Sequence, residues 1–149
     1  MALATPLLMA LMFGSFELGK YFLDEHVVSK AVRDGARYAS RRSFTDFTCA
    51  GASTDVIDRT RNITRTGQVT SGGTARLGYW TNAATITVSV TCNTASPAHN
   101  NGIYKGLATG VPVVTVAASV PYGSLFEDLG FGASAISLNS QSQAAVMGI

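Results

Sequence analysis

The first sixteen residues of the chain contain no charged side chain, and this run constrains the possible folds more than any other feature of the sequence. It reads MALATPLLMALMFGSF and ends where Glu17 brings the first charge. As an α-helix it would be about 24 Å long, slightly less than the roughly 30 Å hydrocarbon core of a bilayer. A helix that is apolar on every side must be surrounded by other apolar groups. The run therefore needs an apolar environment, either within protein or in a membrane.

Three interpretations of this run are open. A cleaved secretory signal has basic residues ahead of its apolar region, and none precedes the run in this sequence. A helix buried in the core of the chain's own domain is the second interpretation. The third is a helix that lies in a membrane before assembly and against copies of itself afterwards. The residues that follow favour the third.

The helical pattern continues beyond Glu17 and becomes amphipathic. Apolar and small residues recur with a period of 3.6 residues from Leu18 to Ala39. The sequence therefore predicts one helix over residues 1–42, with an apolar half for assembly or for a membrane, 1–23, and an amphipathic half, 24–42. The rest of the chain, 43–149, is predicted to form a globular α+β domain.

Several side chains of this helix are candidates for contacts between subunits. The predicted assembly surface comprises Leu7, Leu8, Leu11, Phe13, Gly14, Ser15, Phe16, Leu18 and Gly19. Small residues four positions apart allow helices to approach closely, and there are two such sets: Ser15 with Gly19, and Ala31 with Gly35 and Ala39. The second set is equally suited to packing on the chain's own sheet.

The charged side chains of the helix also leave two interpretations open. Glu17 lies between two apolar residues, where an unpaired carboxylate is costly, and it can pair with Lys20 or with another subunit. Arg33, Arg37 and Arg41 recur every four residues. They either complement the dipole at the end of the helix or pair with Asp24, Glu25 or Asp34 of adjacent subunits. Nucleic acid is not an expected partner, because the net charge is only +2.

A second, short helix is predicted at about residues 52–66. Ser53 or Thr54 is its N-cap and Gly67 its stop, with Val56, Thr60 and Ile63 facing inward.

The chain is nearly uncharged after Arg65 and alternates between apolar and polar residues. Thr85–Thr91 alternates without an error, and Val113–Val120, Ala135–Val146 and Ala75–Trp80 are further predicted strands. We expect one antiparallel sheet with a single apolar face, covered by the amphipathic half of the long helix. The predicted fold class is therefore α+β, a long N-terminal α-helix packed on a small antiparallel β-sheet.

Two connections between these strands have distinct compositions. Residues 93–110 are rich in Asn, Gly, Ala and Thr, which predicts a surface loop. The second connection contains four large apolar side chains that either close the core or contact a neighbouring subunit: Leu125, Phe126, Leu129 and Phe131.

Cys49 and Cys92 are the only cysteines. In an oxidising compartment they would form one disulfide, and the alternative is two buried free thiols. Their spacing is not that of a redox or zinc motif.

No motif for catalysis, metal binding or cofactor binding is found in the sequence. His26 and His99 are far apart in the chain, and both are expected at the surface. Glu127 and Asp128 are adjacent, so their side chains diverge and make a poor acid and base pair. We expect neither an enzyme nor a cofactor.

Two segments of the long helix resemble the TadE/TadG-like pilin family of bacterial Tad pili. They are PLLMALMFGSFELG at residues 6–19 and AVRDGARYA at residues 31–39, which are similar to the family patterns PLLLLLxFGxxELG and AxRxGARYA. The resemblance implies a type IV pilin-like fold and a subunit that a prepilin peptidase processes. It also implies a helix held in the inner membrane until the pilus machinery assembles the extracellular filament. One departure is Thr5, where such pilins usually carry a glutamate.

The predicted function is therefore that of a structural subunit of a type IV-like (Tad) pilus, which polymerises with itself through its apolar helix. The alternative is a minor TadE-like pilin or a membrane-anchored accessory protein that primes pilus assembly or adhesion. A third hypothesis is a secreted adhesive domain that makes contact through the loop of residues 93–110.

Overall fold

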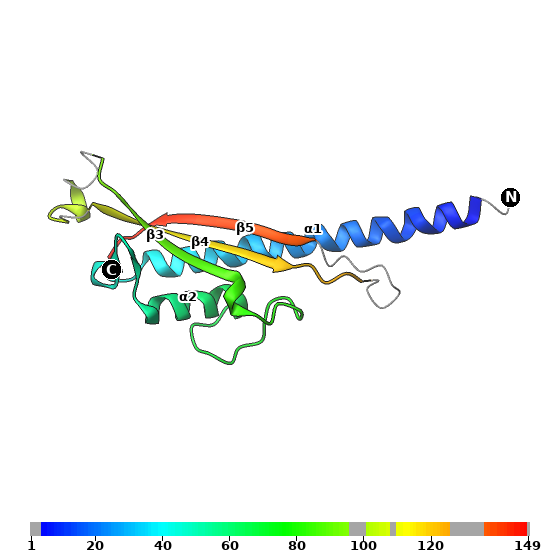
Figure 1. Cartoon of the computed structure of the whole chain (residues 1–149), viewed down its shortest axis with the longest axis horizontal. Coiled ribbons are helices and arrows are strands. Elements are labelled where there is room, and N and C mark those ends of the chain that lie inside the picture. Colours follow the sequence, from blue (N-terminus) through cyan, green and yellow to red (C-terminus); the bar gives the residue numbers. More distant parts are fainter. Residues whose placement is uncertain (1–3, 96–100, 108–109, 126–135, 149) are drawn as a thin grey trace.

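The computed structural model describes residues 4–95, 101–107, 110–125 and 136–148. One helix, α1 (Ala4–Ser40), is the longest element of the molecule. The folded domain lies along the second half of α1, and the first half projects beyond the domain (Figure 1). The predicted long helix is confirmed over these residues. Its end is marked by tight turns, in which the backbone N–H groups of Arg41 and Arg42 donate to carbonyls three residues earlier.

The second helix, α2 (Thr54–Thr66), begins and ends as predicted. The Ser53 hydroxyl accepts a hydrogen bond from the Val56 N–H, and Gly67 ends the helix in the left-handed conformation, with φ 79°. Val56 and Thr60 are fully buried. The prediction for Ile63 was only partly right, because Ile63 is half-buried whereas the next residue, Thr64, is completely buried.

Three of the four predicted strands form one antiparallel sheet in the order β3-β4-β5. The strands are β3 (Ile86–Asn93), β4 (Val111–Pro121) and β5 (Ser137–Ala145). Alternate residues of β3 and β4 face the same side, which is why Ile86, Val90, Val114, Val116, Ala118 and Val120 are all buried. The single apolar face inferred from the alternation is confirmed.

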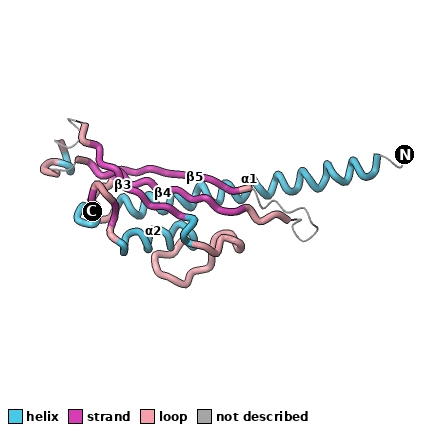
Figure 2. Tube along the Cα trace, viewed as in Figure 1, coloured by secondary structure: helices cyan, strands magenta, loops and turns pink. Residues whose placement is uncertain are grey.

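Both helices cover this apolar face, so the domain has a sheet layer and a helix layer (Figure 2). The core includes Val28, Val32 and Ala36 of α1, together with Val56 of α2. The amphipathic half of α1 is thus the cover that the sequence predicts for the sheet.

The fourth predicted strand, Ala75–Trp80, is wrong. Leu77 and Trp80 are both buried, but they belong to a turn in which the Trp80 N–H donates to the Leu77 carbonyl at 2.8 Å. The Trp80 indole N–H also donates to the Thr85 hydroxyl at 2.8 Å. Apolar side chains three residues apart meet the core from such a turn, so their burial needs no ladder of strand hydrogen bonds.

Several short elements were not predicted. They are a hairpin of β1 (Phe47–Thr48) and β2 (Gly51–Ala52), and the 3-10 turns η1 (Phe44–Asp46), η2 (Ala83–Thr85) and η3 (Gly102–Tyr104). The turn η3 lies within the predicted loop of residues 93–110. The ring of its Tyr104 packs edge-on against the Phe44 ring, with 5.9 Å between the ring centroids.

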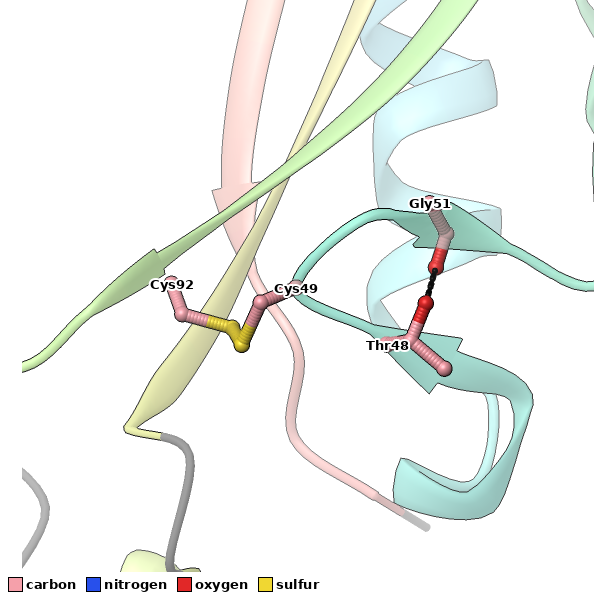
Figure 3. The surroundings of a disulfide bond; sticks show 4 residues. All are labelled: Thr48, Cys49, Gly51 and Cys92. Atoms are coloured by element: carbon pink, nitrogen blue, oxygen red, sulfur yellow. Dashed lines mark hydrogen bonds between the residues drawn. A yellow bond between two sulfur atoms is a disulfide. The ribbon is translucent and has the colours of Figure 1, made fainter.

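A disulfide joins Cys49 in the hairpin turn to Cys92 near the end of β3 (Figure 3). The two Cα atoms are 5.2 Å apart. Within the hairpin, the Thr48 hydroxyl donates to the Gly51 carbonyl at 3.1 Å (Figure 3). Of the two alternatives inferred from the sequence, the disulfide is therefore correct.

Candidate assembly surface

The projecting half of α1 exposes an unusual amount of apolar surface. Leu7, Leu8 and Leu11 are each 64% exposed, and Met9, Met12, Phe13, Phe16, Leu18, Phe22 and Leu23 are exposed as well. A contiguous exposed apolar surface of this kind marks a site of contact with protein or membrane. All the large apolar members of the predicted assembly surface therefore lie open in the isolated chain.

The small residues of the same half are also exposed to solvent in the isolated chain. A Cβ built on Gly14 or Gly19 would meet no atom within 4 Å. Ser15 is exposed, and its hydroxyl donates to the Met12 carbonyl of its own helix at 2.7 Å. No packing within the described part of the chain requires these three positions to be small.

The second set of small residues has the opposite environment. Ala31, Gly35 and Ala39 are buried against the chain's own domain. A Cβ on Gly35 would overlap the Thr64 hydroxyl of α2 and would lie 3.5 Å from Val116 of β4. Of the two alternatives for this set, packing within the chain is therefore the correct one.

A cluster of polar and aromatic side chains fixes the domain to α1 where the exposed half ends. This junction cluster consists of Lys20, Asp24, Tyr79 and Tyr122. The Lys20 ammonium lies 2.6 Å from an Asp24 carboxylate oxygen, which also accepts a hydrogen bond from the Tyr79 hydroxyl at 2.8 Å. The ammonium lies over both rings, 4.9 Å from the Tyr79 centroid and 4.6 Å from the Tyr122 centroid.

Glu17 and Lys20 therefore have partners other than each other. Lys20 donates to the Gly123 carbonyl at 2.7 Å in addition to pairing with Asp24. Glu17 accepts a hydrogen bond from the Leu125 N–H at 3.1 Å, so it holds the segment that follows β4. The predicted local pair of Glu17 with Lys20 is not an ion pair of this structure, because each side chain reaches this segment instead.

The environment of the junction cluster raises the pKa of both tyrosines above the ordinary value of 10.0. Burial is the main cause in each case, and hydrogen bonds to Asp24 for Tyr79 and to Glu17 for Tyr122 add to it. Both hydroxyls thus stay protonated and able to donate at physiological pH. Sequence reasoning missed Tyr79 and Tyr122 as partners of α1, because they lie far from it along the chain.

The three regularly spaced arginines at and just beyond the end of α1 are at the surface. Arg33, Arg37 and Arg41 are exposed, and none makes an ion pair with the described residues. Arg37 and Arg41 line a groove of about 330 Å³ between α1 and the end of α2, together with Tyr38, Ile63 and Arg76. Asp34 also lines this groove and is 2.7 Å from Arg76.

The other candidate residues within the described ranges form no metal site. His26 is exposed, and no group of three or more metal-binding side chains exists among the described residues. Leu125 is 53% exposed. The predictions for His99, Phe126, Glu127, Asp128, Leu129 and Phe131 concern residues outside the described part of the chain.

Within the described ranges, no helix is both long enough and apolar enough to cross a membrane.

Comparison with models of protein families gives a match at the N-terminal end of the chain. The model of the family described as TadE-like protein matches residues 1–37, which confirms the resemblance seen in the sequence. This family is associated with pili and linked to the membrane or the cell surface. No curated protein and no solved structure matches the chain.

Proposed function

We propose that the chain is the structural subunit of a type IV-like (Tad) pilus filament and that it polymerises by packing the projecting half of α1 against the same half of other copies. The observation that carries this proposal is the exposed apolar surface between Leu7 and Leu23, on a helix that the domain leaves uncovered. The TadE-like match includes the same residues and supports the proposal independently.

The energetics favour assembly. Fully burying one leucine side chain contributes about 1.5–3 kcal/mol, and association costs about 4–15 kcal/mol in lost freedom of motion. Leu7, Leu8, Leu11 and Leu18 alone, each more than half exposed, offset much of that cost. The four leucines lie within an arc of about 100° around the helix axis. The exposed Met9 and Phe16 lie on roughly the opposite side, so a copy gains most by contacting several neighbours.

The position of the domain suits a filament with helices inside and sheets outside. The domain lies only along the second half of α1, so several projecting halves can pack together without a clash between domains. The outward residues of the sheet are hydroxyls and amides, including Thr87, Ser89, Asn139 and Gln141, and they suit contact with water. Before assembly, the inner membrane would keep the apolar side chains of the projecting half out of water. The function is assembly, without catalytic turnover.

The test is electron microscopy of filaments sheared from the producing cells, with mass spectrometry of their protein. We expect filaments composed mainly of this chain, with Cys49 joined to Cys92. A chain found only in the membrane fraction, or as a trace component of a filament made of another protein, would show the minor pilin or accessory protein instead.

A matched pair of variants tests the role of α1 in the filament. Leu11→Lys places a charge on the projecting half and should abolish filaments. Ile103→Lys is the control, because Ile103 is exposed to a similar extent, 59% against 64% for Leu11, but lies on the domain. Equal loss of filaments in both variants would count against assembly through the projecting half.

A further inference from the structure

Glu25 is distinctive among the acidic side chains, because no partner for its carboxylate is found among the described residues. The other described carboxylates all have one. Glu17 accepts from Leu125, and the ion pairs are Asp24 with Lys20, Asp34 with Arg76, Asp46 with Arg42, Asp55 with Arg59 and Asp58 with Arg61. Glu25 is half-buried beside the domain, where an unpaired charge is less well solvated than on an open surface.

The groove between α1 and α2 has the complementary charge. Arg37 and Arg41 lie one helical turn apart and both line the groove, and neither has a carboxylate partner among the described residues. Arg76 contributes a third guanidinium group, but Asp34 already pairs with it. The groove therefore keeps two uncompensated positive charges, placed so that one carboxylate can contact both.

Glu25 cannot reach this groove in its own chain. At about 100° per residue, Glu25 projects about 120° away from Arg37 around the helix axis. The separation along the axis is about 18–24 Å, because Arg37 and Arg41 lie twelve and sixteen positions after Glu25. Opposite charges on opposite flanks of one element are satisfied by a heterologous contact between copies, and repetition of such a contact gives an open helical filament.

We propose that the Glu25 carboxylate of one copy binds in the groove of a neighbouring copy, between its Arg37 and Arg41. With the α1 helices parallel, as in the proposed filament, the contact shifts one helix by about 18–24 Å along the axis relative to the other. This inference rests on the proposed function and adds to it the element that determines register. Apolar contacts along the projecting half are non-directional and permit many shifts, whereas a charge pair favours one.

Charge reversal and its rescue test the proposal in the producing cells. Glu25→Arg, and separately Arg37→Glu combined with Arg41→Glu, should each lower the yield of sheared filament per subunit at least about tenfold, because they bring like charges together. All three substitutions in one chain should restore the yield to near the wild-type value. Lys105→Glu is the control, since Lys105 is a cation on the domain without an ion pair among the described residues, and it should leave the yield unchanged.

The outcomes distinguish this inference from the proposed function. Each variant is first tested for the disulfide and for an unchanged melting temperature in detergent, which separates misfolding from failed assembly. Wild-type filaments together with normal assembly of Glu25→Arg would overturn the inference and leave the filament function intact. Loss of filaments in both reversals without rescue in the combined variant would overturn it as well. Absence of filaments from the wild-type chain itself would overturn both proposals.

Discussion

Replacing Gly35 by alanine should destabilise the domain, although alanine is normally the better residue in a helix. The added Cβ would overlap the Thr64 hydroxyl where α1 crosses α2, and Val116 of β4 lies 3.5 Å away on the sheet side. Thr64 has little freedom to move, because it is completely buried and its hydroxyl donates to the Thr60 carbonyl at 2.7 Å. Either the two helices separate or the Thr64 side chain rotates and loses this bond.

The size of the effect follows from three contributions. Overpacking a well-packed core costs about 1–3 kcal/mol. Rotation of Thr64 instead leaves its buried hydroxyl without a hydrogen bond, which costs about 1–3 kcal/mol. Alanine recovers up to about 1 kcal/mol through its better helix propensity. The middle of the overpacking range less the gain in helix propensity gives a net loss of about 1 kcal/mol in the free energy of unfolding, or about 2–4 °C in melting temperature for a chain of this size.

The assay is thermal unfolding of the full-length chain in detergent, followed by circular dichroism. Gly19→Ala is the matched control, because it is on the same helix and a Cβ there meets nothing within 4 Å. It should leave the melting temperature unchanged or raise it slightly. Adding Thr64→Ala to Gly35→Ala removes the overlapping hydroxyl, so the two substitutions should couple favourably by about 0.5–3 kcal/mol.

A melting temperature of Gly35→Ala at or above that of the wild type would refute this reasoning. So would additive effects of Gly35→Ala and Thr64→Ala, because the close contact between the two positions would then carry no energy.

Three further predictions concern the disulfide and the junction cluster. Replacing both Cys49 and Cys92 by alanine should cost about 4 kcal/mol, the chain-entropy value for a loop of this length, and unfolding in detergent with and without reductant measures it. Tyr79→Phe should cost about 1–2 kcal/mol, because it removes the donor to the Asp24 carboxylate; equal stability of the two proteins would contradict the contact. The raised pKa of Tyr79 and Tyr122 means that the folded chain holds these protons more tightly than the unfolded chain. Stability should therefore be unaffected by these groups below pH 10.0 and decrease above it, and phenolate absorbance during alkaline titration checks this.

The sequence alone determined the elements whose signals are local. The uncharged run before Glu17 and the 3.6-residue period after it specify α1, and Ser53 and Gly67 specify the ends of α2. The strict alternation of β3 specifies which of its faces is buried. Each of these signals comes from residues within a few positions of one another, and propensity, capping and periodicity act over that range.

Local signals also produced the errors. The spacing of Leu77 and Trp80 is compatible with a strand and with a turn, and only the position of the core decides between them. Ile63 and Thr64 differ by one helical position, so the direction from which α2 meets α1 decides which one is buried.

Only the tertiary structure decided which partner each ambiguous side chain has. Gly35 has the same local sequence signal as Gly19, yet one lies against α2 and the other is open. Lys20 and Glu17 are suitably spaced to pair with each other. In the structure, however, Lys20 donates to the Gly123 carbonyl and Glu17 accepts from the Leu125 N–H, and both partners are remote in sequence. The physical reason is that these contacts join segments remote in sequence, 103 and 108 positions apart for Lys20 and Glu17, and their geometry depends on how the domain packs on α1. The need of the apolar half of that helix for an apolar partner could be predicted from composition alone. A helix without charged side chains requires such a partner wherever the rest of the chain lies.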